Sequence, residues 1–207
     1  MHFLHLDASI RHDGSVTRAL SRRFVDHLTA GDPDVTVDYI DLAREAPGHI
    51  EQDFVEAMYV PIAAYTPAHR RAVAQSDALV ARFQAADVFV FGVPMYNFAV
   101  PSSLKAFLDQ VVRSGLTFSA SEQGYEGLLT GKRAVVVVGS GGGYQTPETA
   151  AMDFVTPYLR AILAFVGVTD VDFVQAGPTL FYGEDARDAA RAAAETQLDR
   201  LAEAFAR

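Results

Sequence analysis

Hydrophobic residues along the chain form short strand-like runs that alternate with longer stretches of helical spacing. The short runs predict strands at residues 3–8, 34–40, 87–93, 133–139 and 169–174. The third and fourth runs read DVFVFGV and RAVVVVG. Such continuous β-branched and aromatic runs are typical of strands buried on both faces of a parallel sheet.

Apolar stripes with a spacing of three or four residues predict a helix after each strand run. The clearest stripes are Val16, Leu20, Phe24 and Leu28; Leu104, Phe107, Leu108 and Val111; Leu159, Ile162, Leu163 and Val166; and Leu198, Leu201 and Phe205. Thr156 is expected to be an N-cap before Pro157 at the first helical position, and Gly167 ends that helix. The last helix is expected at residues 184–207. Strands and helices that alternate in this way predict one α/β domain over residues 1–207, a parallel sheet with helices on both faces.

Two stretches are longer than this alternation requires. Residues 44–67 contain three prolines and several aromatic residues, and residues 116–130 have the pattern of a short hairpin. Long connections in compact domains are usually functional or interfacial. We therefore expect both stretches to line a pocket or a subunit contact.

Composition narrows the classes of function. The 207 residues include no cysteine, and 17 basic against 26 acidic residues give a net charge of −9. Thiolate metal sites and cysteine nucleophiles are excluded, and the acidic balance disfavours nucleic-acid and anionic-membrane partners. No secretory leader pattern or long apolar segment is found, so we expect a cytoplasmic protein.

In open parallel sheets, ligands bind beyond the carboxyl ends of the strands. The loop after the first strand, residues 7–17, places the hydroxyls of Ser9, Ser15 and Thr17 around a helix N-terminus. Free backbone N–H groups and the positive helix end bind anions, so this loop favours a phosphate group. The alternative is that Ser15 only caps the helix.

The loops after the third and fourth strands add groups that suit a flat heterocycle. The third loop contains Pro94, Met95, Tyr96, Asn97 and Phe98, and the fourth contains Gly139, Ser140, Gly141, Gly142 and Gly143. Amides and aromatic rings fit a hydrogen-bonding ring system, although the third loop could instead pack on its own helix. The glycines permit close backbone approach, but Tyr144 breaks the dinucleotide fingerprint.

No side-chain chemistry is convincing. Ser102 and Lys105 have the spacing of acylating hydrolases without the other motifs of that class, and Gly131-Lys132 precedes a strand where a P-loop would follow one. The histidines lack metal-ligand spacing, so no metal is expected. When a chain offers no nucleophile–base pair, a cofactor usually supplies the chemistry.

Together, Ser9, the Ser15-x-Thr17 pair, the Met95–Phe98 block and the glycine loop at 139–142 resemble the FMN-dependent NADH azoreductase family. These are flavodoxin-like bacterial enzymes that also reduce quinones and were once named acyl-carrier-protein phosphodiesterases. The resemblance extends over the whole chain and includes residues 116–118, 126–128 and 156–159. It implies a doubly wound three-layer sandwich with a five-stranded parallel sheet in the order 2-1-3-4-5.

The resemblance also implies the roles of individual residues. The groups that would hold the FMN phosphate and ribityl chain are Ser9, Ser15, Val16 and Thr17. One side of the flavin ring would contact Pro94, Met95, Tyr96, Asn97 and Phe98. The other side would contact Gly139, Ser140, Gly141 and Gly142. Phe98, Tyr144 and a Phe118 contributed by the partner chain would line the substrate pocket. The family forms homodimers with one FMN per subunit, and no side chain is expected to act as a catalytic acid or base.

The implied reaction is ping-pong: NADH or NADPH reduces FMN by hydride transfer, and a quinone or azo compound then takes two electrons. Val16, and Gly139 with Ser140, replace other residues common in the family, which leaves acceptor and nucleotide preference open. Arg11 and Arg18 are the cations nearest to the phosphate loop in sequence. The alternatives are a flavodoxin-like FMN electron carrier without an acceptor site, and a hydrolase, which would be colourless.

Overall fold

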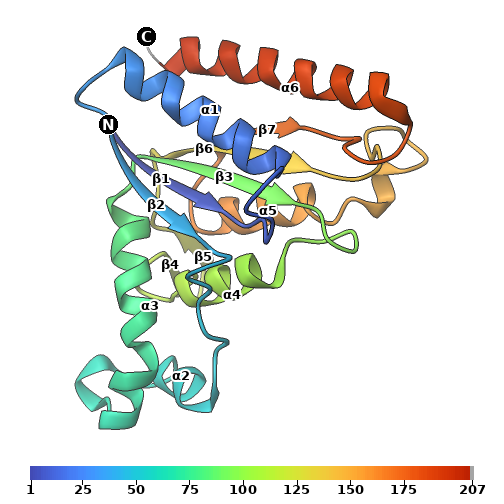
Figure 1. The fold of residues 1–207 in the computed structure, drawn as a ribbon. Helices are drawn as coiled ribbons and strands as arrows, with labels where there is room; N and C mark the ends of the chain where they lie inside the picture. Colours follow the sequence, from blue (N-terminus) through green and yellow to red (C-terminus); the bar gives the residue numbers. More distant parts are fainter. Residues whose placement is uncertain (206–207) are drawn as a thin grey trace.

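Five parallel strands form the central sheet in a computed structural model, which describes residues 1–205. The strands are β1 (His2–Asp7), β2 (Thr36–Asp41), β3 (Val88–Pro94), β6 (Arg133–Gly139) and β7 (Asp170–Gln175). Their spatial order is β2-β1-β3-β6-β7 (Figure 1). Counting only the strands of this sheet, the order is 2-1-3-4-5, so the predicted topology is confirmed.

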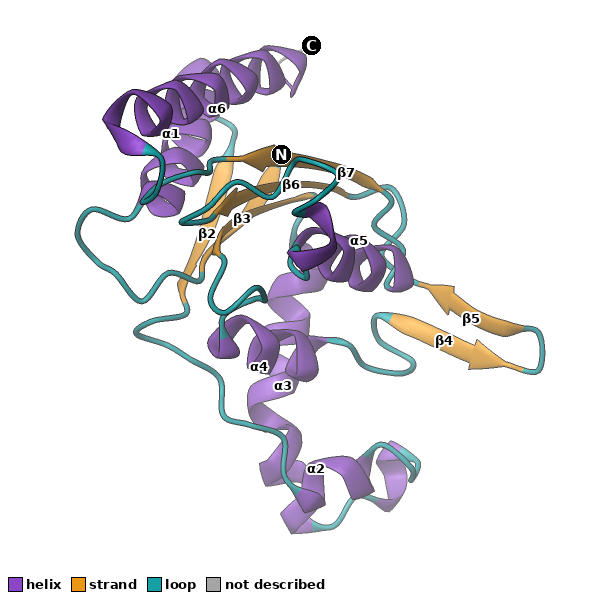
Figure 2. Ribbon diagram, turned by 90° about the vertical axis from the view of Figure 1, so that its right-hand side faces the viewer, coloured by secondary structure: helices purple, strands orange, loops and turns teal. Residues whose placement is uncertain are grey.

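Helices cover both faces of the sheet (Figure 2). One face carries α1 (Val16–Gly31) and α6 (Gly183–Phe205); the other carries α3 (Pro67–Ala85), α4 (Ser102–Val111) and α5 (Thr156–Phe165). The predicted end of the last helix at residue 207 lies outside the described residues. Among residues 1–205, no helix combines the length and the apolar character needed to cross a membrane.

The apolar strands divide their side chains between two cores. On β3, Val88 and Val90 contribute to the core under α1 and α6, whereas Phe89 and Phe91 contribute to the core under α3, α4 and α5. Successive side chains of a strand point to opposite faces, so a central strand of this sheet must be apolar at every position. This explains why the runs in β3 and β6 do not alternate with polar residues.

The two long stretches form the projecting parts of the molecule. The hairpin consists of β4 (Phe118–Ser121) and β5 (Gly124–Gly127), as expected from the sequence. The other stretch contains α2 (Gln52–Ala57) and the 3₁₀ turn η1 (Ile62–Ala64). Both project from the side of the sheet that carries α3, α4 and α5 (Figure 2).

One predicted helix start is wrong. Thr156 lies inside α5, and the N-cap residue is Val155, whose side chain makes no capping hydrogen bond. The backbone N–H groups of Val155 and Thr156 instead both donate to Oδ1 of Asp153, at 2.9 Å each. Asp153 therefore satisfies the free donors of the first turn from two residues before the cap. It follows the short 3₁₀ turn η2 (Ala150–Met152).

Candidate functional site

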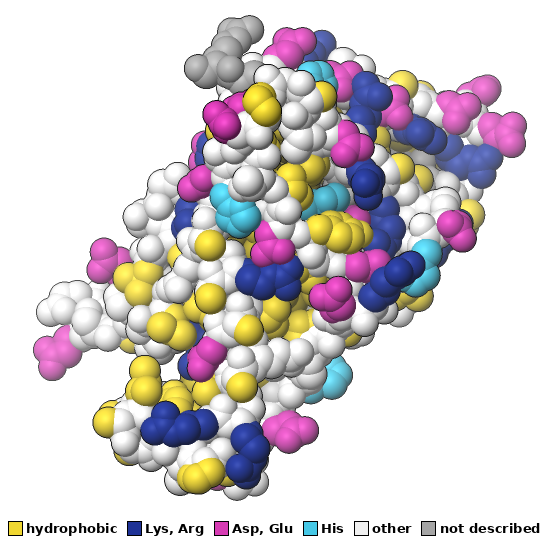
Figure 3. Space-filling model, turned by 60° about the vertical axis from the view of Figure 1, so that its left-hand side comes forward, with side chains coloured by type: hydrophobic (Ala, Val, Ile, Leu, Met, Phe, Trp, Pro, Cys, Tyr) yellow, Lys and Arg dark blue, Asp and Glu magenta, His cyan; other side chains and the backbone are white. Residues whose placement is uncertain are grey.

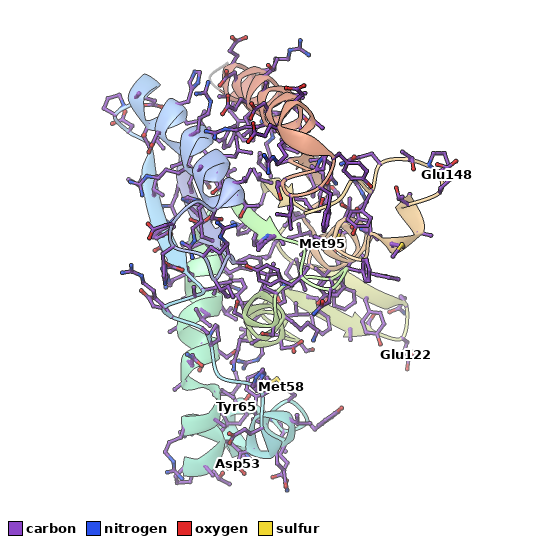
Figure 4. All side chains as sticks on the ribbon, turned by 45° about the vertical axis from the view of Figure 1, so that its right-hand side comes forward. Asp53, Met58, Tyr65, Met95, Glu122 and Glu148 are labelled. Carbon is purple, nitrogen blue, oxygen red and sulfur yellow. The ribbon has the colours of Figure 1, made fainter. Side chains whose placement is uncertain are left out.

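The loops after β1, β3 and β6 meet at the carboxyl edge of the sheet. The N–H of Met95 donates to the carbonyl oxygen of Gly139 at 2.7 Å, and the N–H of Ile10 donates to the Tyr96 hydroxyl at 3.2 Å. Met95 lies centrally in the molecule, directly after β3, whereas Glu148 and Glu122 mark outlying loop tips (Figure 4). Pro94, the last residue of β3, pairs with Gly139. The three loops singled out from the sequence are therefore brought together.

The first loop presents hydroxyls at the N-terminus of α1. Ser15 caps the helix, because its Oγ accepts a hydrogen bond from the Arg18 N–H at 3.4 Å, and it lies 3.3 Å from Oγ1 of Thr17. The buried Ser9 Oγ accepts from the Arg11 N–H at 3.3 Å, which leaves its own hydroxyl proton free to donate. The first turn of α1 contains no acidic residue. Capping by Ser15 is thus confirmed, and it is compatible with anion binding at the same helix end.

The third loop forms a tight turn with unusual backbone geometry. Tyr96 and Ala99 exchange two backbone hydrogen bonds of 3.0 and 3.1 Å, and the residues between them, Asn97 and Phe98, have φ of 49° and 69°. Asparagine tolerates this left-handed region, but an aromatic residue there is an outlier of the kind that clusters at functional sites. The turn presents both side chains to solvent at the edge of the site.

Two contacts hold the strained residue in place. The Phe98 carbonyl oxygen accepts from the Phe154 N–H at 3.0 Å. The Phe98 ring meets Tyr144 edge-on, with ring centroids 6.2 Å apart. Phe98 and Tyr144, both expected to line the substrate pocket, are therefore in contact, and Phe154 joins the α5 side of the site to this turn.

The glycine loop is close to α1 on one side and to the loop after β7 on the other. A Cβ atom added to Gly139 would lie 2.5 Å from Cγ2 of Thr17, and one added to Gly141 would lie 3.3 Å from the Phe181 ring. Ser140 is buried, and its Oγ donates to the Gly142 carbonyl oxygen at 2.7 Å. The close approach of α1 therefore requires glycine at position 139. Val16, the neighbour of Thr17, is partly buried and packs against the core under α1 and α6.

The loop after β7 is a part of the site that the sequence analysis did not include. The N–H groups of Leu180 and Phe181 donate to the Gly141 carbonyl oxygen at 3.2 and 3.0 Å, and the Thr179 N–H donates to the carbonyl oxygen of Ser140. Three consecutive apolar side chains of this loop are exposed, namely Leu180, Phe181 and Tyr182. The general rule that ligands bind at the carboxyl ends of strands also covers this loop.

Arg18 does not lie free beside the phosphate loop. Its guanidinium donates to the Ser9 carbonyl oxygen from Nε at 3.2 Å, to the Tyr39 hydroxyl from Nη1 at 3.0 Å and to Asp41 Oδ1 from Nη2 at 2.5 Å. The Tyr39 hydroxyl donates to Asp7 Oδ2 at 2.9 Å. We call these residues, Asp7, Ser9, Arg18, Tyr39 and Asp41, the Arg18 network.

Burial and neighbouring charges shift the pKa values of three side chains in the Arg18 network. Burial disfavours ionisation of Asp41, but the hydrogen bond from Arg18 outweighs it and holds the Asp41 pKa below its usual value. At Asp7, burial is likewise outweighed, here by His5 and by the hydroxyls of Tyr39 and Ser21, so its pKa is also lowered. Burial and the neighbouring Asp7 raise the pKa of Tyr39 to about 12. At neutral pH both carboxylates are therefore ionised and Tyr39 keeps its proton.

A cleft of about 720 Å³ opens between the third loop, which follows β3, and the starts of α4 and α5. We call it the β3–α5 cleft; it is lined by Tyr96, Asn97, Ala99, Val100, Pro101, Ser102, Lys105, Phe154, Pro157 and Tyr158. Most of these side chains are apolar or aromatic, as expected of a small-molecule site. Lys105 pairs with Asp109, and Ser102 is an exposed first-turn residue of α4, so no serine–lysine pair exists.

Phe118 does not reach this cleft within its own chain. Its ring packs against Phe165, with centroids 4.7 Å apart, and against Tyr125 on the neighbouring hairpin strand. It is not among the residues that line the β3–α5 cleft. Across residues 1–205, no group of three or more His, Asp or Glu side chains is arranged to hold a metal ion.

Comparisons with known proteins agree with this architecture. A family model described as a flavodoxin-like fold matches residues 1–201. An FMN-dependent NADH:quinone oxidoreductase from Trichormus variabilis is 43% identical over 205 residues, 98% of this chain and 97% of the relative. Another from Jannaschia sp. is also 43% identical, over 97% of this chain and 98% of the relative.

Solved structures show the same fold at lower identity. An azoreductase from Bacillus anthracis superposes with a TM-score of 0.90 at 24% identity and covers 98% of both chains. An FMN-dependent NADH-azoreductase from the same species, in complex with FMN, has a TM-score of 0.85 at 24% identity and covers 97% of this chain and 99% of its own. The chain belongs to the flavodoxin-like family that includes these FMN-dependent NADH:quinone oxidoreductases.

Proposed function

We propose that this protein is an FMN-dependent NAD(P)H oxidoreductase that reduces quinones and azo compounds. The observation that carries the proposal is the junction of three loops, in which a hydroxyl-lined helix N-terminus, a left-handed Asn97-Phe98 turn and a glycine loop meet. The named functions of the relatives at 43% identity over nearly the full chain support it. The fold, taken alone, would equally suit an FMN electron carrier.

The residues present fit FMN. A dianionic phosphate would lie at the N-terminus of α1, where Ser9, Ser15 and Thr17 offer hydroxyls and backbone N–H groups are free. The flavin ring would contact residues 94–98 on one side and residues 139–142 on the other. The close approach at Gly139, where a Cβ would clash with Thr17, places bare backbone beside the phosphate end.

FMN supplies two-electron hydride chemistry when it is bound. The protein's part is to hold the reactants and to exclude water. Asn97 would give polar contacts to the flavin edge, and the aromatic side chains of Phe154 and Tyr158 in the β3–α5 cleft would pack on a flat acceptor. An electron carrier needs no such cleft, so the cleft favours the reductase over the alternative.

We further propose that the chain is a single domain that acts as a homodimer in the cytoplasm, without nucleic-acid or membrane partners. Exposed apolar side chains gather over the α2 region, seen as a yellow cluster at the lower end of Figure 3. They include Val55, Tyr59 and Ile62. Exposed apolar clusters mark interaction surfaces, and a partner chain at this face would support a contribution of Phe118 to the second site.

The direct test is reconstitution with FMN. We expect the purified protein to bind FMN with a visible flavin spectrum and to oxidise NADH or NADPH in the presence of menadione or an azo dye. Comparing the two nucleotides also decides the preference that the sequence leaves open. FMN binding without steady nucleotide oxidation would support the electron carrier, and absence of FMN binding would contradict both proposals.

A pair of variants tests Asn97. Asn97→Gly removes the side-chain amide and leaves the left-handed backbone unstrained, whereas Asn97→Ala removes the amide and adds strain. We expect both variants to release FMN more readily than the wild type in equilibrium dialysis, with the glycine variant equally stable to urea. If Asn97→Gly retains FMN as the wild type does, Asn97 has no polar contact to the flavin.

A further inference from the structure

The guanidinium of Arg18 connects three segments at the phosphate end of the site. Arg18 lies in the first turn of α1, and its Nε and Nη2 both donate to the Ser9 carbonyl oxygen, at 3.2 and 2.5 Å. Nη2 also donates to Asp41 at the end of β2, and Nη1 to Tyr39 on the same strand. One side chain thus joins the first loop and α1 to the edge strand β2.

This arrangement leaves Arg18 poorly placed to bind phosphate itself. Its side chain is 12% exposed, and two carboxylates, Asp7 and Asp41, lie 3.6 and 2.5 Å from its guanidinium nitrogens. Arg44 also lies 3.5 Å from Asp41, so these two arginines and two carboxylates carry no net charge and offer an anion little attraction. An attraction of Arg18 for the phosphate therefore cannot be its main effect.

The position of Ser9 depends on this contact. Ser9 is 2% exposed, and its carbonyl oxygen is held by Arg18 while its hydroxyl oxygen accepts from the Arg11 N–H. The next residue, Ile10, donates its N–H to Tyr96 of the third loop. Fixing the Ser9 carbonyl therefore sets both the direction of the Ser9 hydroxyl and the junction between the phosphate loop and the third loop.

We propose that Arg18 is a positioning residue for the FMN phosphate, acting through the Ser9 carbonyl and anchored by Asp41. The inference rests on the proposed FMN function. Lysine cannot replace arginine here, because a single ammonium nitrogen lacks the planar fork whose Nε, Nη1 and Nη2 bind Ser9, Tyr39 and Asp41 at the same time. Arg18→Lys leaves the charge of the Arg18 network unchanged, so the effect of geometry can be separated from the effect of charge.

The experiment compares FMN with riboflavin, which lacks the phosphate, by fluorescence titration of Arg18→Lys. We expect the ratio of the riboflavin Kd to the FMN Kd to fall by about tenfold or more, as for loss of a charge-assisted hydrogen bond, because riboflavin binding weakens much less than FMN binding. The control is Arg23→Lys, on the same helix, whose pairing with Asp199 lies away from the site. It should leave the ratio at the wild-type value.

A second variant distinguishes the positioning role of Arg18 from a purely electrostatic effect on the phosphate. Asp41→Ala removes a negative charge near the phosphate, so a purely electrostatic effect would tighten FMN binding, whereas loss of the Arg18 anchor should weaken it. A wild-type ratio in Arg18→Lys, or tighter FMN binding in Asp41→Ala, overturns the positioning role while leaving the proposed function intact. If the wild type binds no FMN, the proposed function fails, and this inference fails with it.

Discussion

Gly139 and Thr17 face each other where the glycine loop crosses the start of α1. The 2.5 Å separation between a Gly139 Cβ and the Thr17 Cγ2 leaves no room for a methyl group. We predict that Gly139→Ala destabilises the fold by about 1–3 kcal/mol, the usual cost of overpacking, and weakens FMN retention. Urea unfolding and FMN titration measure the two effects.

The matched rescue for this clash is Thr17→Ser, which removes Cγ2 and keeps the hydroxyl. The double variant Gly139→Ala/Thr17→Ser should recover most of the stability and FMN affinity, because the two substitutions act at one contact and are not additive. Additive losses in the double variant would show that Gly139 is needed for another reason.

The residues of the site that could be predicted are those adjacent in sequence. Ser15 and Thr17 lie in one loop, and Asn97 and Phe98 in another, so composition and spacing alone reveal them. The Arg18–Asp41 contact joins residues 23 apart, and its pairing follows only from strands β1 and β2 lying side by side. The positive φ of Phe98 was likewise hidden, because aromatic residues rarely adopt it.

At the scale of elements, the start of α5 links helix stability to the site. Asp153 accepts the N–H groups of Val155 and Thr156, and Phe154, which lies between Asp153 and Val155, donates its N–H to the Phe98 carbonyl oxygen. Asp and Thr are both good capping residues, so the sequence gives no means of choosing between Asp153 and Thr156. The strands were easier to predict, because burial on both faces requires an unbroken apolar run.

We predict that Asp153→Ala lowers the free energy of unfolding by about 1 kcal/mol, as for loss of a helix cap. The control is Asp153→Asn, which keeps a side-chain oxygen in the accepting position and should lower the free energy of unfolding much less. Urea denaturation monitored by circular dichroism measures both. Equal losses in the two variants would mean that the negative charge, and not the capping hydrogen bonds, carries the effect.

The helix α2 could not be predicted from the sequence pattern. The six-residue helix α2 lies within the stretch predicted only as a long connection. It is held by a small apolar cluster of Phe54, Ala57 and Val73, separate from the two main cores. Arg113 stacks over the Phe54 ring, 5.5 Å from its centroid. These contacts come from α3 and from the segment that follows α4, and no local periodicity indicates them.

For the whole molecule, a net charge of −9 coexists with ion pairs spread over the surface. Basic and acidic side chains are interspersed on the side of the molecule seen in Figure 3. Arg82 forms a two-point pair with Asp38, at 2.7 and 2.6 Å, and thereby joins α3 to β2. Such local pairing explains how the chain accommodates an excess of carboxylates at neutral pH.

These pairs give the stability of the protein a defined dependence on pH. The hydrogen bond from Arg82 lowers the Asp38 pKa below its ordinary value of 3.8, and the Asp7 and Asp41 pKa values are lowered as well. A carboxyl whose pKa is lower in the folded state stabilises the fold at pH values above its unfolded pKa. That stabilisation is lost as the pH falls through the folded pKa.

We therefore predict that Asp38→Asn is less stable than the wild type near pH 7, and that the difference shrinks toward zero as the pH falls below 3.8 and through the lowered pKa of the folded state, where the wild-type carboxyl takes up a proton. Asp34→Asn, at an exposed residue between α1 and β2, makes the same charge change without breaking an ion pair and serves as the control. Urea unfolding across this pH range measures both differences. A deficit in Asp38→Asn that persists undiminished in acid would mean that the side chain contributes through packing, and that its ion pair with Arg82 adds nothing to the stability of the sheet edge.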